Sequence, residues 1–336
     1  MKKLTLADIV VVAGLALLTG AAHATTHEYF SGKTIRIMTL AAGGGFDEYS
    51  RAIARHIGTH LLGNPTVVVD NMGRALVSNL YRGAKPDGLT VGNIPGSQIV
   101  RQLLRARDIE FDPRKFEWIG VPVGDNAVCA LTKASGITSL EQWMDSKTPV
   151  KIGGTRPGNP TDDIPKVLKA ALGLPIQLVT APGGSGGIRL AAESGDVAGA
   201  CLGWETIKAT WRKGLESGDV NIVIQATPKA HRDLPNVPLA IDLAKTEEAR
   251  RLIQVGIHEP SAITRPYALP PGTPKDLVQT LRKAFMDTMK DKKFLAEAEK
   301  SKLDIDPVSG EEVERIVAGL FQQEATMVAK LREILK

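Results

Sequence analysis

The 336-residue chain has few aromatic residues, few cysteines and no long hydrophobic run beyond its first segment. Phe, Trp and Tyr make up only 4% of it, which argues against the stacking platforms of proteins that bind single-stranded nucleic acid. Two cysteines are too few ligands for a thiolate metal site. After position 24, no segment is apolar enough to span a bilayer, which takes about 20 residues. We therefore expect a globular protein that binds no nucleic acid, metal or other cofactor.

The charge of the chain is only mildly unbalanced. Lys and Arg number 42 against 37 Asp and Glu, which gives a net charge of +5. The basic residues are scattered and form no run typical of a nucleic-acid patch. A weak positive balance of this kind slightly favours anionic ligands.

The first 24 residues have the pattern of a secretory leader. Lys2 and Lys3 precede the apolar run Ile9–Leu18, and Ala22-His23-Ala24 fits a small-residue cleavage site. A run of about 10 residues is too short to cross a membrane. We expect cleavage near Ala24 and a periplasmic mature protein, with an uncleaved anchor as the alternative.

Glycine is abundant, at 33 residues, and strand and helix patterns alternate along the chain. The sequence predicts a strand over Lys33–Leu40, a helix over Phe46–Ile57 and further strands at Thr66–Val69 and Thr90–Ile94. Such alternation is typical of parallel α/β sheets. The same rhythm returns after residue 150, and a helix is expected to begin near Asp163 because Pro165 belongs in a first turn.

The length favours two domains. An extended stretch over Trp118–Leu131 is a candidate crossing into a second domain, and the chain is expected to return near Arg250–Ile257. The predicted division is therefore a leader over 1–24, lobe 1 from 25–123 and 251–336, and an inserted lobe 2 over 124–250. Cys129 and Cys201 lie in strand-like stretches and either pair as a disulfide or remain two buried thiols.

The stretch Leu40–Asp47 is a candidate anion site. A strand ends there in three glycines, and a helix begins at once, so unpaired N–H groups and the positive end of the helix dipole coincide. An ordinary tight turn is the alternative. Asp47 either stabilises the helix start or contacts the ligand. The candidate residues are Gly43, Gly44, Gly45, Phe46 and Asp47.

A second candidate lies between a strand and a helix at Gly153–Asp163. Arg156 can grip a carboxylate with two parallel bonds, unless it is an ordinary surface arginine. Asp162 and Asp163 repel an anion there unless they cap the helix or point away. The candidate ligand-binding residues of this loop are Thr155, Arg156, Gly158 and Asn159.

Two further glycine-containing segments that follow strands, Pro182–Gly187 and Gly203–Glu205, are candidates for the same cleft. Ligands of open α/β sheets lie at the carboxyl ends of strands. Trp204 is either an apolar wall of the pocket or a packing residue. Catalytic patterns are weak: His56 and His60 lack the glutamate of a zinc motif, and Ser185 has no evident base. A hydrolase that uses Ser185 is a distant alternative.

Several motifs together resemble those of one protein family, the periplasmic substrate-binding receptors of tripartite tricarboxylate transporters (the Bug family). The segments that carry the resemblance follow in the family's order along most of the chain: Ala42–Asp47, Val67–Gly73, Ala84–Thr90, Leu190–Ala198, Leu234–Pro238 and Pro270–Pro274.

This resemblance implies a two-lobed type II periplasmic binding fold, with two doubly wound sheets joined by crossing strands, that closes over a carboxylated ligand. It implies ligand contacts at Gly43–Asp47 and Gly154–Asn159, joined by Gly96, Ser97 and Trp204. Where the family has a small Ser/Gly-rich loop, this chain carries Arg156 and two aspartates. A dicarboxylate, an aromatic acid, and a ligand whose amine or hydroxyls meet Asp162 or Asp163 therefore all stay open.

Taken together, the sequence predicts a monomeric, non-enzymatic receptor that binds a small organic acid and delivers it to membrane transporter subunits. A receptor that presents its ligand to a membrane sensor is the alternative output.

Overall fold

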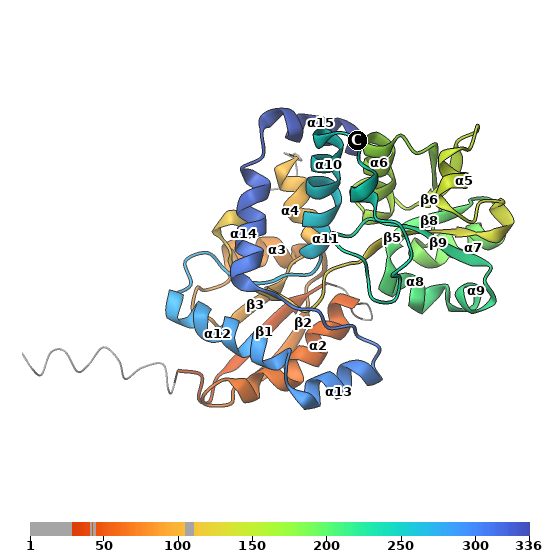
Figure 1. The fold of residues 1–336 in the computed structure, drawn as a ribbon. Helices are drawn as coiled ribbons and strands as arrows, with labels where there is room; N and C mark the ends of the chain where they lie inside the picture. Colours follow the sequence, from red (N-terminus) through yellow and green to blue (C-terminus); the bar gives the residue numbers. More distant parts are fainter. Residues whose placement is uncertain (1–28, 41, 43–44, 105–110) are drawn as a thin grey trace, which may run out of the picture.

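The computed structural model describes residues 29–336 except 41, 43–44 and 105–110. The predicted leader lies outside these residues. Two separate mixed sheets, each packed between helices, form two lobes that lie side by side (Figure 1). The predicted α/β fold class is thereby confirmed. No helix within the described ranges is long and apolar enough to cross a membrane.

Lobe 1 is built on a six-stranded sheet with the order β11-β4-β10-β3-β1-β2. Its strands are β1 (Thr34–Thr39), β2 (Thr66–Asn71), β3 (Thr90–Asn93), β4 (Glu117–Val121), β10 (Tyr267–Leu269) and β11 (Val308–Ser309). Its helices are α2 (Gly45–Ile57), α3 (Leu76–Ser78), which continues as the π-turn η3 (Asn79–Gly83), α4 (Gly96–Leu103), α12 (Lys275–Thr288), α13 (Lys292–Lys300) and α14 (Gly310–Phe321). Because β2, β1 and β3 run parallel, the loops after β1 and β3 meet at one edge.

Lobe 2 is built on a five-stranded sheet with the order β7-β6-β8-β5-β9. Its strands are β5 (Ala127–Thr132), β6 (Val150–Gly154), β7 (Ile176–Thr180), β8 (Gly199–Gly203) and β9 (Val220–Gln225). Its helices are α5 (Leu140–Met144), α6 (Pro160–Leu172), α7 (Gly184–Glu193), α8 (Trp204–Thr210) and α9 (Arg212–Ser217). The parallel strands β7, β6 and β8 bring their following loops to one edge as well.

The helix α6 begins earlier than the sequence predicts. It starts at Pro160 rather than near Asp163, and it runs through Pro165. The main-chain N–H groups of Asp162 and Asp163 both bond to the carbonyl of Asn159, which places Asn159 at the cap. The predicted start was too late because Pro165 was placed in the first turn, whereas it lies further inside the helix.

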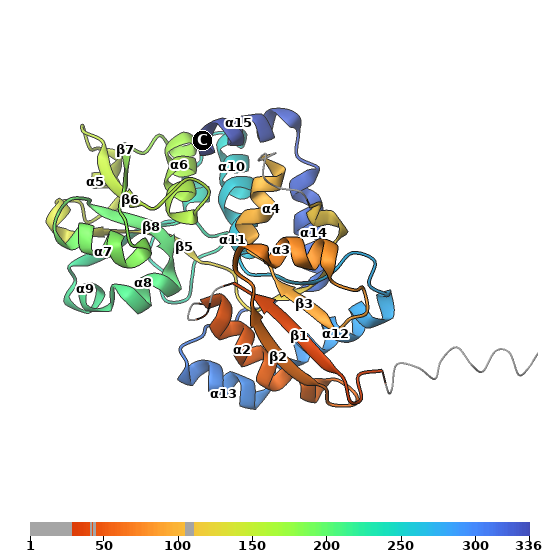
Figure 2. The same cartoon turned by 180° about the vertical axis from the view of Figure 1, so that it is seen from behind.

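The lobes are connected by two crossings and by a helical layer. The first crossing, residues 122–126, joins β4 to β5, and the second, residues 263–266, leads into β10. The amide of Asp125 donates to the carbonyl of Ser261 at 2.9 Å, so the crossings lie together. The helices α10 (Glu247–Ile253), η7 (Gln254–His258), α11 (Glu259–Ala262) and α15 (Ala325–Leu335) lie between the lobes, as Figure 2 shows from behind. Helices α10 and α15 pack on α6. The predicted boundary at 250/251 falls inside α10, and the domain boundaries stay a prediction.

The core follows from these layers. One apolar cluster runs through both lobes along α4, α6, α10 and α15, and two smaller clusters fill the opposite sides of the two sheets. Cys129 of β5 and Cys201 of β8 are directly paired residues with Cα atoms 3.9 Å apart, and they form a disulfide. The structure thus selects the disulfide from the two states that the sequence left open.

Candidate functional site

A cleft of about 1200 Å³ lies between the lobes. Lobe 1 contributes its β3–α4 junction, α3 and the start of α2, and lobe 2 contributes the β6–α6 loop and the end of β8. The residues whose chemistry matters here are Phe46, Tyr81, Arg82, Gly96, Ser97, Arg101, Asp125, Arg156, Gly158, Asn159, Asp163, Gly203 and Arg265, all of which line the cleft. The volume is large enough for a small organic molecule.

The β3–α4 junction holds its shape through buried neutral hydrogen bonds. Asn93 is fully buried, and its amide Nδ2 donates to the carbonyl of Phe46 at 3.2 Å, to Ser50 Oγ at 3.1 Å and to Tyr267 Oη at 3.1 Å. At Gly96 the carbonyl oxygen of Ile263 lies 2.0 Å from where a Cβ atom would stand, so only glycine fits. The start of α2 and the start of α4 are therefore fixed at one edge of the sheet.

One face of α4 lines the cleft. The half-buried residues Ser97, Val100 and Arg101 of α4 and Leu104 just after it line the cleft with the spacing i, i+3, i+4, i+7. The first turn of α4 contains no acidic residue, so the positive end of the helix is directed to the cleft without an internal counter-charge. Gly96 and Ser97, both predicted ligand residues, lie at this end.

The glycine loop after β1 is only partly described. Gly43 and Gly44 lie outside the described residues. Gly45 begins α2 and is exposed, and Phe46 lines the cleft. Asp47 is buried within lobe 1, where its carboxylate accepts from Arg51 Nε at 3.0 Å and from Asn71 Nδ2 at 2.9 Å.

In the β6–α6 loop of lobe 2, a carboxylate of the chain already occupies the main-chain donors. Asp162 is 3% exposed, and its Oδ1 accepts from the amides of Thr155 at 2.6 Å and Arg156 at 3.0 Å. The Thr155 hydroxyl is also taken, because it bonds to Thr161 Oγ1 at 2.9 Å and accepts from Asn159 Nδ2 at 2.8 Å. Thr155 does not line the cleft, whereas Asn159 does.

Two side chains of this loop remain directed to the cleft with opposite charge. Arg156 is exposed, lines the cleft and forms no ion pair with any described residue. Asp163 is half-buried and accepts from the amide of Gly158 at 3.1 Å. Burial raises the pKa of Asp163 to about 6, against the opposing effects of the Gly158 amide and of Lys166.

Arg265 is a residue that the sequence analysis missed. It lies in the second crossing, lines the cleft, and its guanidinium bonds to Asp125 Oδ1 at 2.8 Å across 140 positions of sequence. The same group stacks over the Tyr49 ring at 5.2 Å, and its Nε is buried without a hydrogen-bond partner in the described ranges. No local motif marks it, because its partners come from two distant segments.

Among the described residues that line the cleft, the charged ones are Arg82, Arg101, Arg156, Arg265, Asp125 and Asp163. Asp125 is engaged by Arg265, and Asp163 has a raised pKa. Arg156 forms no ion pair with a described residue, so it offers a positive charge to the cleft, which suits an anionic ligand.

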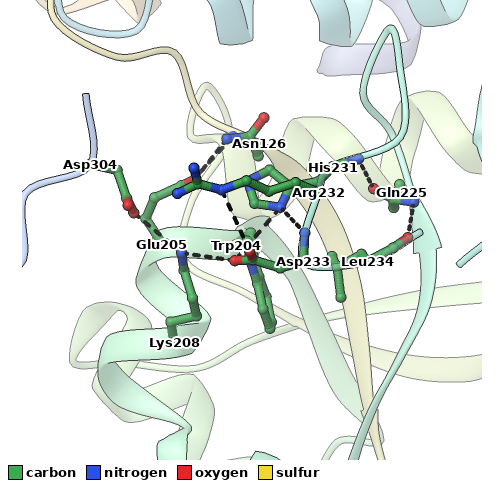
Figure 3. A network of polar contacts seen from close by, with 10 residues as sticks. All are labelled: Asn126, Trp204, Glu205, Lys208, Gln225, His231, Arg232, Asp233, Leu234 and Asp304. Carbon is green, nitrogen blue, oxygen red and sulfur yellow. Dashed lines mark hydrogen bonds and ion pairs between the residues drawn. The ribbon is translucent and has the colours of Figure 1, made fainter. Parts of the chain in front are cut away.

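Trp204, also predicted as a ligand residue, is placed in a polar network beside the cleft (Figure 3). Its indole Nε1 donates to Asp233 Oδ2 at 3.0 Å, and it is not among the residues that line the cleft. Lys208 lies 3.3 Å from both Asp233 and Asp304, and Asp304 belongs to lobe 1. The network thus contains an ion pair between the lobes. Gly203, immediately before Trp204, does line the cleft.

The remaining candidates from the sequence lie elsewhere. Ser185 is in the first turn of α7 and does not line the cleft. No hydrogen bond joins it to a histidine within the described part of the chain. In that same part, no three His, Cys, Asp or Glu residues are grouped so as to hold a metal ion.

No protein-family profile and no curated protein matches the sequence. Among solved structures, a TctC solute-binding protein from Polaromonas matches with a TM-score of 0.71 at 16% identity, over 90% of this chain and 98% of that one. Rpa4515 of R. palustris with adipate matches with a TM-score of 0.64 at 18% identity, over 90% and 98%.

MatC of Rhodopseudomonas palustris with bound malate matches with a TM-score of 0.60 at 17% identity, over 91% of this chain and 100% of that one. These likenesses cover nearly the whole of each chain at low identity, so they bear on the fold. The resemblance predicted from the sequence motifs is confirmed at that level: the chain has the two-lobed α/β fold of the TctC-type solute-binding proteins.

Proposed function

We propose that this protein is a periplasmic receptor for a small carboxylated organic acid, which it delivers as a monomer to a membrane transporter of the tripartite tricarboxylate type. The observation that carries the proposal is Arg156, an exposed arginine that lines the interlobe cleft and forms no ion pair with a described residue. The similar folds that are known with adipate and malate support the choice of a carboxylate.

The binding mode follows from the two walls. The start of α4, with Ser97, and the guanidinium of Arg265 bind one carboxylate from lobe 1, where the positive end of the helix dipole and a partly engaged arginine meet. Arg156 approaches the same acid from lobe 2. Closure of the lobes then replaces the hydration of the acid by fixed donors.

The test is a thermal-shift and calorimetry screen of the purified protein against organic acids, with sugars and simple amines as controls. A ligand that binds only the native state raises the midpoint, and a concentration of about 100 times Kd is worth about 2.7 kcal/mol. We expect a shift from acids only. No shift from any acid would refute the proposal.

A matched pair of arginine variants localises the binding. Arg156→Ala is expected to weaken acid binding about tenfold or more, because a charge-assisted hydrogen bond contributes about 1.5–3 kcal/mol. Arg212→Ala removes an exposed arginine at the start of α9, outside the cleft, and is expected to leave Kd unchanged. Equal Kd values in the two variants would remove Arg156 from the site.

A further inference from the structure

Asp163 stands out among the acidic groups of the cleft. Of the two carboxylates that line the cleft, Asp125 is bonded to Arg265, whereas Asp163 forms no ion pair with a described residue. Among the described residues, its carboxylate accepts one hydrogen bond, from the amide of Gly158 at 3.1 Å. A carboxylate accepts about four hydrogen bonds, so Asp163 retains acceptor capacity next to the cleft.

Asp163 is not needed to hold the β6–α6 loop. The neighbouring Asp162 already performs that task, because it accepts from two loop amides and from the hydroxyl of Thr161 at 3.3 Å. The half-burial of Asp163 also has a cost, since burial disfavours its ionised form. A carboxylate in this place repels a ligand carboxylate unless the ligand also brings a hydrogen-bond donor.

The segment from Arg156 to Asp163 also supplies a positively charged side chain. Arg156 and Asp163 both line the cleft from the two sides of the loop that Asp162 holds closed, with Gly158 and Asn159 between them. Gly158 has a left-handed φ of 83°, a conformation that favours glycine, and its amide bonds to Asp163. Lobe 2 therefore presents one donor group and one acceptor group to whatever occupies the cleft.

We propose that Asp163 is a specificity-determining residue that accepts a hydrogen bond from a hydroxyl or ammonium group of the bound acid. The inference rests on the proposed function and deepens it: the ligand is a hydroxy acid or an amino acid rather than an unsubstituted acid. Its carboxylate binds Arg156 and the lobe 1 donors, and its hydroxyl or ammonium group binds Asp163.

The experiment compares acids that share a carbon skeleton and differ in one group. Each set contains the unsubstituted acid, its hydroxy analogue and its amino analogue: succinate, malate and aspartate; glutarate, 2-hydroxyglutarate and glutamate; propionate, lactate and alanine. Calorimetry of the wild-type protein is expected to give a Kd about tenfold or more lower for a donor-bearing member than for its unsubstituted partner. The hydroxy and amino members distinguish the two sources of the donor.

Variants assign the preference to one residue. Asp163→Asn and Asp163→Ala are expected to reduce the preference to about threefold or less, because a hydrogen bond to a neutral group is about half as strong and alanine offers none. The matched control is Asp145→Asn, which removes the same charge from an exposed position of lobe 2 outside the cleft. It is expected to keep the full preference. Circular dichroism and melting temperatures verify that each variant is folded.

The outcomes separate the inference from the proposed function. If no acid of these sets or of the wider screen binds, the proposed function fails, and the inference fails with it. If only acids outside these sets that carry no hydroxyl or amine bind, the receptor stands and the role of Asp163 is refuted. If acids bind but the unsubstituted members bind equally well, the receptor stands and the role of Asp163 is refuted. A preference that survives in both Asp163 variants also refutes the role of this residue.

Discussion

The junctions β3–α4 and β6–α6 share one strand–loop–helix arrangement, but they differ in whether the first turn of the helix contains acidic residues. Each joins the carboxyl end of a parallel strand to the start of a helix at the interlobe cleft. The first turn of α4 has no acidic residue, whereas that of α6 contains Asp162 and Asp163. In lobe 2 the chain has thus supplied its own anion to the loop, and in lobe 1 it has not.

The difference shows how a strand–loop–helix motif should be interpreted. Main-chain N–H groups at a helix start form an anion site for whichever carboxylate reaches them first. Asp162 reaches those of Thr155 and Arg156 within its own loop. In the proposed receptor, lobe 2 is therefore expected to recognise a ligand through side chains, while the end of α4 and Arg265 line the cleft from lobe 1.

The largest expected effect comes from removing the cross-link that only lobe 2 has. The double variant Cys129→Ala/Cys201→Ala opens a bond that spans 72 residues, and lobe 2 is expected to lose about 4 kcal/mol of unfolding free energy in the chain-entropy account. Urea unfolding followed by tryptophan fluorescence measures the loss. Wild-type protein unfolded under reducing conditions should behave like the variant. If both lobes lose the same unfolding free energy, the effect is not confined to lobe 2 and the prediction is wrong.

The second prediction converts the loop of lobe 2 toward the state of lobe 1. Asp162→Ala leaves the amides of Thr155 and Arg156 without an acceptor and is expected to cost about 3 kcal/mol. Sulfate should recover part of the lost melting temperature in the variant, because the vacated amides then bind an external anion. Asp145→Ala serves as the control that sulfate does not affect. If sulfate does not raise the melting temperature of the variant, the loop has collapsed and its amides do not bind an external anion.

A smaller and pH-dependent effect is expected at Asp163. Its folded-state pKa of about 6 exceeds the ordinary value of 3.8, so ionisation opposes folding above pH 6 and has no effect on stability below about pH 4. Asp163→Asn is therefore expected to be more stable than wild type by about 2 kcal/mol at pH 8. The gain should disappear as the pH falls from about 6 to about 4. Unfolding curves across that range test the sign, and a gain that is independent of pH would contradict it.

The smallest effect is expected at the ion pair between the lobes. Lys208 and Asp304 are each about one-third exposed, at 32% and 37% of their side-chain surface, so solvent screens their attraction. Lys208→Met is expected to change the unfolding free energy by less than about 1 kcal/mol. Thermal unfolding measures the change. A loss of several kcal/mol would mean that the network around Trp204 holds the lobes together far more strongly than its exposure implies.

Much of the fold was predictable because its signals are local. The helix predicted over Phe46–Ile57 is α2, which begins one residue earlier, and the strand predicted over Thr90–Ile94 is β3, which ends one residue earlier. The short strands β10 and β11 were not predicted. The helix caps at Ser139 and Ser309 are local too, because each hydroxyl accepts from the amide three positions later. The hydroxyl of Thr273 bonds to the carbonyl of Pro270 rather than capping α12. Local hydrogen bonding of this kind competes with capping.

The cleft was less predictable because its decisive contacts are long-range. The loop at Gly153–Asp163 was found from its glycines and its place before a helix, and the sequence analysis left open whether its aspartates cap or point away. In the structure Asn159 is at the cap of α6, Asp162 accepts from the loop amides of Thr155 and Arg156, and Asp163 faces the cleft. Arg265 had no signal in its neighbourhood, since its role depends on Asp125 and Tyr49 from distant segments.

The pairing of the two crossings has a consequence for motion. Any rotation of one lobe against the other bends the chain at these crossings, and points near a rotation axis travel least. Arg265 and Asp125 lie on the crossings themselves, whereas Arg156 lies on a loop of lobe 2 away from them. In the proposed receptor we therefore expect Arg265 to move little when the lobes open and Arg156 to move further. An acid would then bind Arg265 first, and Arg156 would reach it as the lobes close.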